Sequence, residues 1–451
     1  MSDTFTSIQA YQFALDPTPT QERALRSHCG AARFAYNELI KRWLAAANQY
    51  FAETTYGVPK EERTPLPFWN FQGARNLMNA LKTEIAPWWE QNSKEAFASG
   101  ARDAAEGAMN WYKSLTGKRK GPRMGRPRLK KRTETLSMRF TTGVMRIAKG
   151  RNAVVLPRLG EIHTHESPRK LRRRIQNGTA RIMSATVKRK AGRWFVILTT
   201  KVTRPVRTHM YPGSAVGVDV GVKDLLVAAT PDGEEVLRVP MPARIKALEK
   251  KRRALQRRTR HQQAPRRGVA PSKRWQRSHE RQARLYGKIM NLREDAIYKA
   301  TTRLSKRYET VALETLNVAG MRSRGGAYKK GLNGAISRAA LATTRRLLEY
   351  KTTRESGSLV LAARWYPSSK TCSACGVVRT KLHLSEREYV CDSCGAVLDR
   401  DLNAAINLAR LAGVSPGVAR LVDVEPSGRP QHLRDVVATG YEASTFNKPS
   451  S

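Results

Sequence analysis

The sequence predicts an α+β protein of several domains, and three observations along the 451-residue chain lead to that class. Apolar residues recur at helical spacing through the first quarter, short β-type runs follow at about 135–205, and buried strands alternate with helices from about 210 to 410. A chain of this length accommodates roughly two to four domains of about 100–200 residues each. Apolar residues make up 40% of the composition and aromatic residues 7%, which is enough for packed hydrophobic cores.

The first quarter of the chain is expected to be a strand followed by helices. Residues 1–16 predict the strand. Thr18, Pro19 and Gln21 then supply an N-cap, a proline at the first helical position and the glutamine of a capping box, so a helix begins here. Its apolar stripe continues to Trp43, and further helical material extends to about residue 116. The tryptophans of that material are interpreted as core residues rather than as a platform for stacked bases; they are Trp69, Trp88, Trp89 and Trp111.

The segment from about 135 to 205 predicts a small β-barrel or sheet. Its runs at 152–162 and 181–202 are rich in Val, Thr, Ile and aromatic residues. Within the second run, Ala191-Gly192 separates two strand-like halves, which indicates a hairpin. Together with the opening strand, these runs predict one β domain that is interrupted by the helical segment.

The second half of the chain alternates predicted strands and helices. A near-continuous apolar strand is expected at 215–230, broken by Asp219, and another strand ends near Glu314. Between them, 244–307 predicts two long helices, which the proline- and glycine-rich segment at 262–272 separates. The order is completed by a helix at 335–352, a strand at 356–365, a cysteine module and a last helix from about 402.

Net charge is the dominant feature of the composition. Lys and Arg number 83 against 37 Asp and Glu, which gives a formal net charge of +46. The excess is localised: 244–307 holds 22 basic and four acidic residues, 118–132 mixes Gly, Pro and basic residues, and 411–451 is neutral. A positive excess of this size indicates the phosphate backbone of a nucleic acid as the partner. The candidate contact residues are Lys118, Arg119, Lys120, Arg123, Arg126, Arg128, Lys130, Lys131, Arg252, Arg253, Arg257 and Arg258.

The sequence gives no sign of a membrane partner. No apolar run approaches the roughly 18–20 residues of a membrane span, and the N-terminus lacks the basic-then-apolar order of a secretory signal. We therefore expect a soluble, intracellular protein. The oligomeric state stays open.

Three acidic residues lie within or next to apolar segments, where burying a carboxylate costs free energy. Asp219 lies within the apolar run VGVDVGV, Glu314 ends the run VALE, and Asp401 opens the DLNAAINLA helix. Burying a carboxylate among apolar neighbours is unfavourable unless a cation or hydrogen bonds compensate it. Two strands of a central sheet and a helix start can bring the three together to bind Mg²⁺, two ions of which would clamp the attacking and leaving oxygens of a phosphodiester.

The order of these elements is typical of the ribonuclease H-like nuclease fold: a strand carrying Asp, a hairpin turn, a later strand ending in Glu and a helix opening with Asp. The alternative is that the three acids are separate turn or capping residues, since Asp is a good helix N-cap. Asp399 is a rival for the third position, and spacing does not separate it from Asp401. Asp224 is a further candidate.

The four cysteines Cys372, Cys375, Cys391 and Cys394 predict a metal site. They form two C-x2-C pairs fifteen residues apart, each followed by a glycine. This spacing matches a tetrahedral structural Zn²⁺ site with no open position for a substrate. Disulfides are the competing interpretation, which an intracellular protein disfavours. Cys29 lies on the apolar stripe of the first helix and is expected to be a buried small hydrophobe.

Four motifs resemble those of the TnpB family, which bacterial insertion sequences encode, and of its relatives, the compact type V CRISPR effectors. They are GVDVGVKDLLV around Asp219, ALETLNVAGM around Glu314, RWYPSSKTCSACG before the zinc module, and CDSCGAVLDRDLNAAINLA, which ends past Asp401. The resemblance is strong over about 210–410. It implies an RNA-guided, Mg²⁺-dependent DNA endonuclease with a RuvC-like site, in which Asp401 is the third catalytic carboxylate. Relatives more often carry an uncharged residue at the position of Asp224, so it is not interpreted as a ligand.

The resemblance also implies a domain organisation and partners. A β-barrel wedge domain is split by a helical recognition domain, and a RuvC-like nuclease domain with a zinc-ribbon insertion follows. These parts are expected to hold a guide RNA, the double-stranded target DNA and a short duplex motif beside the target. The ranges are 1–16 and 118–209 for the wedge domain, 17–117 for the recognition domain, 210–410 for the nuclease domain with its basic helical pair at 244–307 and zinc ribbon at 368–398, and 411–451 for a tail that is expected to be flexible.

Two other activities are compatible with the same core. One is a strand-transfer transposase, which would act on transposon ends without bound RNA. The other is a nuclease-inactive, RNA-guided repressor, which the complete set of three acids disfavours. The expected location is the prokaryotic cytoplasm, on the nucleoid. The sequence does not distinguish a guide from a transposon end from one that a CRISPR array supplies.

Overall fold

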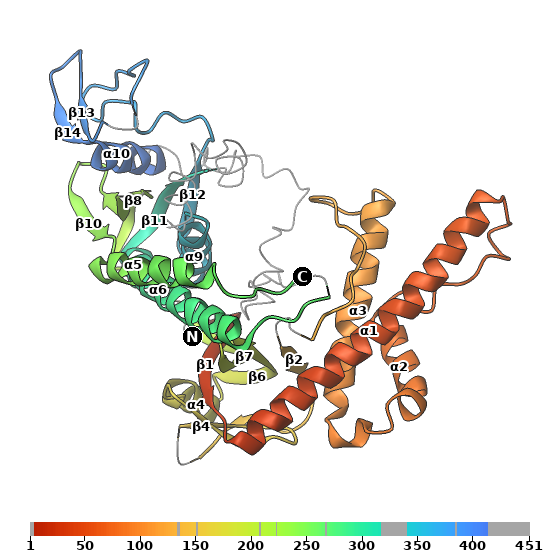
Figure 1. Cartoon of the computed structure of the whole chain (residues 1–451). Helices are drawn as coiled ribbons and strands as arrows, with labels where there is room; N and C mark the ends of the chain where they lie inside the picture. The colour runs from red at the N-terminus through yellow and green to blue at the C-terminus, as the bar shows by residue number, and fades with distance from the viewer. Residues whose placement is uncertain are drawn as a thin grey trace. The chain divides into compact units, whose positions relative to one another are not determined.

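The computed structural model describes residues 4–132, 136–149, 152–206, 209–221, 223–266, 268–316, 341–383 and 386–413 (Figure 1). The chain divides after Arg204 into two compact units. The first begins at Thr4, and the second begins at Pro205.

The first unit contains a seven-stranded sheet with the order β2-β6-β7-β1-β5-β4-β3. The predicted hairpin is confirmed: β6 and β7 pair around a turn in which Ala191 and Gly192 have φ of 50° and 80°. Positive φ at both central residues is what a type I′ turn requires, and its twist matches that of the strands. The opening strand is also confirmed, as β1. The strands are β1 (Thr4–Asp16), β2 (Ser137–Phe140), β3 (Arg146–Ile147), β4 (Ala153–Leu156), β5 (Gly160–Thr164), β6 (Ala180–Lys190) and β7 (Arg193–Pro205).

The first helix begins where the sequence places its cap. The Thr18 hydroxyl accepts the Gln21 N–H at 3.3 Å, and the Gln21 side chain accepts the Thr18 N–H at 3.0 Å, which completes the predicted capping box. A short helix, α4, lies in the segment that was expected to hold strands alone; of its residues only Leu171 is buried. Eight residues are too few for helical periodicity to be visible in the sequence. The helices are α1 (Pro19–Thr55), α2 (Phe71–Ile85), the 3₁₀ helix η1 (Trp89–Gln91), α3 (Lys94–Leu115) and α4 (Arg169–Gln176).

Three of the four tryptophans assigned to the core are partly buried and pack against it: Trp88, Trp89 and Trp111. Trp43 is fully buried, donates its indole N–H to the Phe68 carbonyl at 3.1 Å and meets Trp111 edge-on with 5.7 Å between ring centroids. Trp69 is an exception, since 52% of its surface is exposed. Cys29 is buried as predicted, and burial raises the pKa of its thiol to about 12.

The second unit is built on a five-stranded sheet with the order β10-β9-β8-β11-β12, in which β8, β11 and β12 are parallel. One expectation is wrong here: 215–230 is not a single strand that Asp219 interrupts. It is an antiparallel hairpin, and Asp219 is the last residue of its first strand. A carboxylate at a strand end keeps part of its surface exposed, which lowers the cost of burial. The strands are β8 (Tyr211–Asp219), β9 (Asp224–Ala229), β10 (Glu235–Pro240), β11 (Tyr308–Glu314) and β12 (Ser358–Ala362).

Helices cover both faces of this sheet. On one face, Val216 and Val218 of β8 pack with Leu304 of α6 and Leu348 of α9. On the other, Ala215 packs with Leu408 of α10. Alternate residues of β8 thus face opposite helical layers, as the two-residue period of a strand requires. The helices are α5 (Ala243–Thr259), α6 (Lys273–Arg307), α9 (Leu341–Arg354) and α10 (Arg400–Gly413).

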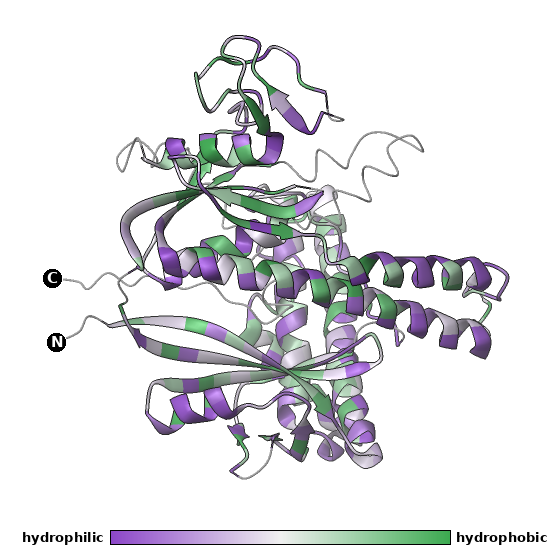
Figure 2. Cartoon of the chain, turned by 90° about the vertical axis from the view of Figure 1, so that its left-hand side faces the viewer, coloured by the Kyte–Doolittle hydropathy of each residue, from purple (hydrophilic) through white to green (hydrophobic). Residues whose placement is uncertain are grey.

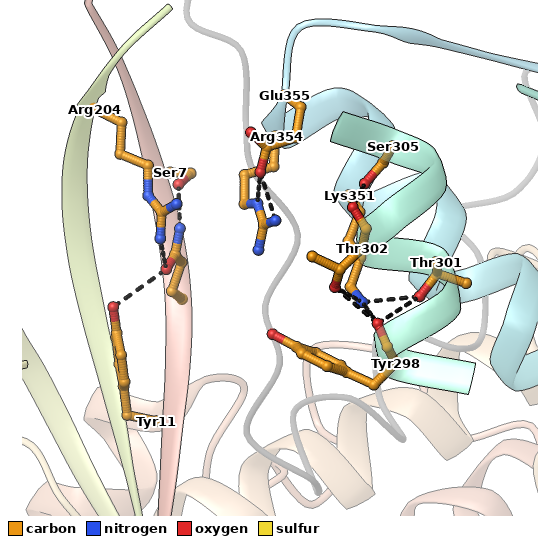
Figure 3. Close-up of polar contacts among 11 residues, drawn as sticks. Ser7, Tyr11, Arg204, Tyr298, Thr301, Thr302, Ser305, Lys351, Arg354 and Glu355 are labelled. Atoms are coloured by element: carbon orange, nitrogen blue, oxygen red, sulfur yellow. Dashed lines mark hydrogen bonds and ion pairs between the residues drawn. The ribbon is translucent and has the colours of Figure 1, made fainter. Parts of the chain in front are cut away.

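A buried lysine joins two of these helices (Figure 3). Lys351 of α9 is 0% exposed, and its ammonium donates to the Tyr298 carbonyl at 2.6 Å and to the hydroxyls of Thr301 and Thr302 at 2.8 and 2.7 Å, all on α6. Burial lowers the pKa of Lys351 to about 7. An adjacent ion pair joins Arg354 to Glu355. The contact fixes α9 against the basic helix α6.

Some expected segments fall partly outside the described residues. The helix predicted at 335–352 is present from Leu341, and residues 335–340 lie outside. The predicted tail is described only as far as residue 413, in the last turn of α10. Within the ranges that the structure covers, no helix is long and apolar enough to cross a bilayer.

Candidate active site

Two of the three predicted carboxylates lie at adjacent strand ends. Asp219 ends β8 and Glu314 ends β11, and the preceding residues Val218 and Leu313 are directly paired. Because the two strands are parallel, both carboxylates are at the same edge of the sheet. Ala362, which ends β12, pairs with Glu314 and places a third strand end at this edge.

A glycine brings the third carboxylate to the same edge. A Cβ atom at Gly217 would lie 2.0 Å from the Ala405 carbonyl oxygen and 2.3 Å from the Ala409 nitrogen, so α10 packs with its backbone directly against β8. One turn before Ala405, Asp401 lies beside the turn after β8: its Oδ2 is 3.5 Å from where a Gly221 Cβ would be. Glycine in a strand commonly marks such a close approach. The structure therefore gathers Asp219, Glu314 and Asp401.

The charges of these carboxylates are not balanced within the cluster. Burial raises the pKa of Asp219 well above its ordinary value, and the negative charges of Glu314 and Asp401 raise it further. Burial also raises the pKa of Glu314 and that of Asp401, where the charge of Asp399 adds to it. Arg400 opposes all three shifts without cancelling them. Each acid nevertheless keeps part of its surface exposed.

The structure separates the rival Asp399 from Asp401. Asp399 Oδ1 accepts the N–H groups of Asp401 and Leu402 at 3.1 and 3.0 Å, so Asp399 is the residue that caps α10. The interpretation of Asp401 as the cap is wrong, because the helix begins at Arg400. Arg238 pairs with Asp399 at 3.3 Å, and these contacts lower the pKa of Asp399 against the effect of burial.

Asp224 belongs to the same neutralised group. Its carboxylate pairs with Arg238 at 3.0 Å, and Glu235 pairs with the same guanidinium at 2.7 Å. One arginine thus binds three acids at the margin of the site. This agrees with the interpretation that Asp224 is not a ligand.

Sequence reasoning missed Ser368, which holds Glu314 in place. Ser368 is 1% exposed, and its hydroxyl donates to the Glu314 carboxylate. The Ser368 carbonyl accepts from the buried side-chain amide of Asn407 at 2.8 Å, which ties the residue to α10. The position lies inside the motif RWYPSSKTCSACG, in which the cysteine pattern is a stronger signal than the serines.

The four cysteines form a compact group. All four Sγ atoms lie within 4.8 Å of one another, with 3.7 Å between Cys372 and Cys394 and 3.5 Å between Cys375 and Cys391, and none is in a disulfide. Gly376 and Gly395, with φ of 80° and 71°, close the two knuckles. Four sulfur ligands in this arrangement can hold a metal ion such as zinc. In the part of the chain that the structure covers, no other three potential ligands are as compact, so the carboxylates are spaced more widely.

The metal module is tied to the helix that carries Asp401. Its hairpin consists of β13 (Glu388–Val390) and β14 (Val397–Asp399), and α10 follows directly. Asn403 of α10 is fully buried, accepts the Ser373 N–H at 2.8 Å and donates to the Thr371 carbonyl at 2.7 Å. These hydrogen bonds attach α10 to the module.

The basic loop at 118–132 lies along helices rather than free in solvent. Asn37 of α1 donates to the Lys130 carbonyl at 3.1 Å and accepts its N–H at 2.8 Å, and the Lys130 ammonium lies 4.2 Å from the ring centroid of Tyr36. The guanidinium of Arg126 lies over Trp111 at 5.6 Å. Exposed positions along the loop are Lys118, Lys120, Arg123, Arg126, Arg128 and Lys131, whereas Arg119 and Lys130 are half-buried.

The predicted helical pair is confirmed as α5 and α6, which lie side by side (Figure 2). Gln282 of α6 donates to the Thr259 hydroxyl of α5 at 2.7 Å, and Arg252 lies 6.0 Å from the ring centroid of Tyr286. Arg252 is half-buried by this contact, which leaves it less available to a partner than we expected. Arg253, Arg257 and Arg258 are exposed.

Known proteins similar to this chain identify its family. A family model described as "Probable transposase" matches residues 197–324, and a model of a Cas12f1-like TNB domain matches 342–408. A protein of Mycobacterium tuberculosis, "Putative RNA-guided DNA endonuclease Rv2885c", is 36% identical over 97% of this chain and 95% of its own length. The chain belongs to the TnpB family. A second TnpB-family relative, "Putative RNA-guided DNA endonuclease InsQ" of Escherichia coli strain K12, is 27% identical over 94% of this chain and 96% of its own length.

Two further similarities concern structure. The solved chain titled "Cryo-EM structure of the Cas12f1-sgRNA-target DNA complex" is 15% identical, with a TM-score of 0.49, covering 90% of this TnpB-family chain and 99% of that one. A model described as a helix-turn-helix domain matches residues 7–50. In this structure that segment is strand β1 followed by the single helix α1, without a second helix.

Proposed function

We propose that this protein is an RNA-guided, Mg²⁺-dependent DNA endonuclease. The observation that carries the proposal is the gathering of Asp219, Glu314 and Asp401, with their charges unbalanced, at one edge of the parallel sheet. Membership of the TnpB family and a net charge of +46 support a nucleic-acid substrate. We assign the site to a ribonuclease H-like, RuvC-type domain, within the domain ranges given above.

The three carboxylates fit hard divalent cations. Oxygen ligands with an excess of negative charge are what Mg²⁺ prefers, and their spacing is wider than that of the compact cysteine group. Mg²⁺ bound there would lower the pKa of a water molecule and stabilise the leaving oxygen of the phosphodiester. Ser368 orients Glu314, and Arg400 limits repulsion among the acids. Asp399 and Arg238 fix the start of α10 and so the position of Asp401.

We assign Zn²⁺ to the four cysteines as a structural ion, because all four positions of the tetrahedron are filled by sulfur. The exposed basic residues of the 118–132 loop and of α5 are assigned to RNA and DNA backbones. Guide pairing would then read the sequence, while the protein reads duplex shape and a short adjacent motif. Because there is one set of catalytic carboxylates, a single active site would have to cut both DNA strands, one after the other. With these partners, the location that we propose is the nucleoid of the prokaryotic cytoplasm.

The test is to express the protein with its flanking genomic DNA, sequence the RNA that co-purifies, and assay cleavage of a matched duplex. Asp219→Asn, Glu314→Gln and Asp401→Asn should each abolish Mg²⁺-dependent cleavage and leave target binding intact. Asp399→Asn is the matched control: the amide oxygen still caps α10, so cleavage should persist within about tenfold.

The alternatives give other results in the same assay. Activity on transposon ends without RNA would replace the proposal by strand transfer. RNA-guided binding with no cleavage by the wild-type protein would indicate a repressor. Cleavage that persists in Asp401→Asn would refute the site.

A further inference from the structure

Trp365 is exposed beside the acidic cluster. It is 83% exposed, the largest exposed fraction among the tryptophans of the chain. The next residue, Tyr366, faces inward and donates its hydroxyl to the Asn407 carbonyl of α10 at 3.2 Å. Of these two adjacent aromatic side chains, Tyr366 therefore packs against the core and Trp365 lies in solvent. Nothing in the fold of the described residues requires a tryptophan at this position.

Both ends of the loop that carries Trp365 are anchored at Glu314. On the N-terminal side, Ala362 is the strand partner of Glu314. On the C-terminal side, the Ser368 hydroxyl donates to the Glu314 carboxylate. Trp365 is three residues from each anchor, and three residues span at most about 11 Å. The indole is thus held within a few nucleotide lengths of the carboxylates.

The loop has a fixed conformation and a positive charge. The Tyr366 N–H donates to the Ala363 carbonyl at 2.9 Å, and the Lys370 N–H donates to that of Pro367 at 2.9 Å, so the loop consists of two turns. The Arg364 guanidinium lies 4.8 Å from the centroid of the Trp365 ring. An exposed aromatic ring next to an arginine is the combination with which proteins bind single-stranded nucleic acid, the ring stacking on a base and the arginine adding charge.

We propose that Trp365 is a positioning residue that stacks on a base of the DNA strand at the acidic site, close to the phosphodiester that is cut. The inference rests on the proposed function and adds to it a residue that selects single-stranded over paired DNA. A base within a duplex is already stacked on both sides, whereas an unpaired base gains from the indole.

The proposed stacking predicts four outcomes. Trp365→Ala should lower the cleavage rate constant about 5- to 100-fold, the range that the loss of one base–aromatic stack gives. Trp365→Phe keeps a stacking ring and should retain most of the rate. Binding of the matched target by the RNA-loaded protein should change less than about twofold, because guide pairing supplies most of it. Thermal unfolding should be unchanged, since the side chain is exposed.

The deciding experiment pairs the protein variants with abasic DNA. The RNA-loaded holoprotein is assayed with targets that lack one base at successive positions near the cut. In the wild type, one abasic position should lower the rate as much as Trp365→Ala does. Trp365→Ala should then be insensitive to that position, which a merely structural role of Trp365 would not produce.

Two results would overturn the inference. One is equal cleavage rates of Trp365→Ala and the wild type. The other is that the abasic position lowers the rate of Trp365→Ala by the same factor as it lowers the rate of the wild type. If the wild type itself does not cut RNA-matched DNA, the proposed function fails and this inference fails with it. Cutting by the wild type with no effect at Trp365 would remove the stacking role alone.

Discussion

Gly217→Ala should disable the acidic cluster without touching any acid. The added Cβ would lie 2.0 Å from the Ala405 carbonyl oxygen and 2.3 Å from the Ala409 nitrogen, both backbone atoms that no rotamer change can move. Since such contacts are essentially never shorter than 3.0 Å, α10 has to move by about 1 Å or more. A displacement of this size at a catalytic group lowers rates about 100-fold. The forced contact should also destabilise the unit by about 1–3 kcal/mol.

The assay compares cleavage rate constants of RNA-loaded proteins at a temperature well below their melting transitions, with target binding measured in parallel. Gly217→Ala should lose about 100-fold in rate, with binding within about threefold. Gly30→Ala is the matched control, because nothing lies within 4 Å of its added Cβ and alanine favours the helix α1. A Gly217→Ala protein that cuts at the wild-type rate would refute the placement of α10 on β8.

Three further outcomes follow from the same structure. Ser368→Ala should lower cleavage about 10- to 100-fold with target binding unchanged, because Glu314 loses its orienting hydrogen bond; equal rates would remove that role. Lys351 has a folded-state pKa of about 7 against 10.5 when unfolded, so the unfolded chain binds the extra proton and stability rises with pH between these values. The wild type should therefore gain about 2 kcal/mol in total from pH 7 to 9 relative to Lys351→Met, measured by denaturant unfolding; parallel pH profiles would contradict this. Chelation of the metal at the four cysteines should lower both the melting temperature and the cleavage rate, since Asn403 connects that module to α10, and a chelated protein with unchanged melting would show that no ion stabilises it.

The sequence predicted the elements whose signals are local. The capping box at Thr18, the Ala191-Gly192 hairpin and the two basic helices each depend on residues that are close along the chain, and the structure has all of them. The C-x2-C pairs likewise predicted the compact cysteine group. All of these features depend on the spacing of residues along the chain, which can be read directly from a sequence.

The rest depended on contacts between distant segments. Spacing could not separate Asp399 from Asp401, because both lie at the start of one helix. The structure separates them: Asp399 caps α10 and pairs with Arg238, which lies more than 150 residues earlier in the chain. The role of Gly217 follows from a helix that begins at residue 400. Sequence reasoning treated Lys130 as a solvent-facing contact, whereas the Tyr36 ring and the Asn37 side chain of α1 hold it.

The most direct test of the central claim is cleavage of a matched DNA duplex by protein that carries its co-purified RNA, with the wild type and Asp401→Asn compared side by side. Our account predicts that the wild type cuts only DNA that matches the RNA and only with Mg²⁺, and that Asp401→Asn binds the same DNA with similar affinity without cutting it. Cleavage that does not depend on the RNA, or that survives in Asp401→Asn, would contradict it.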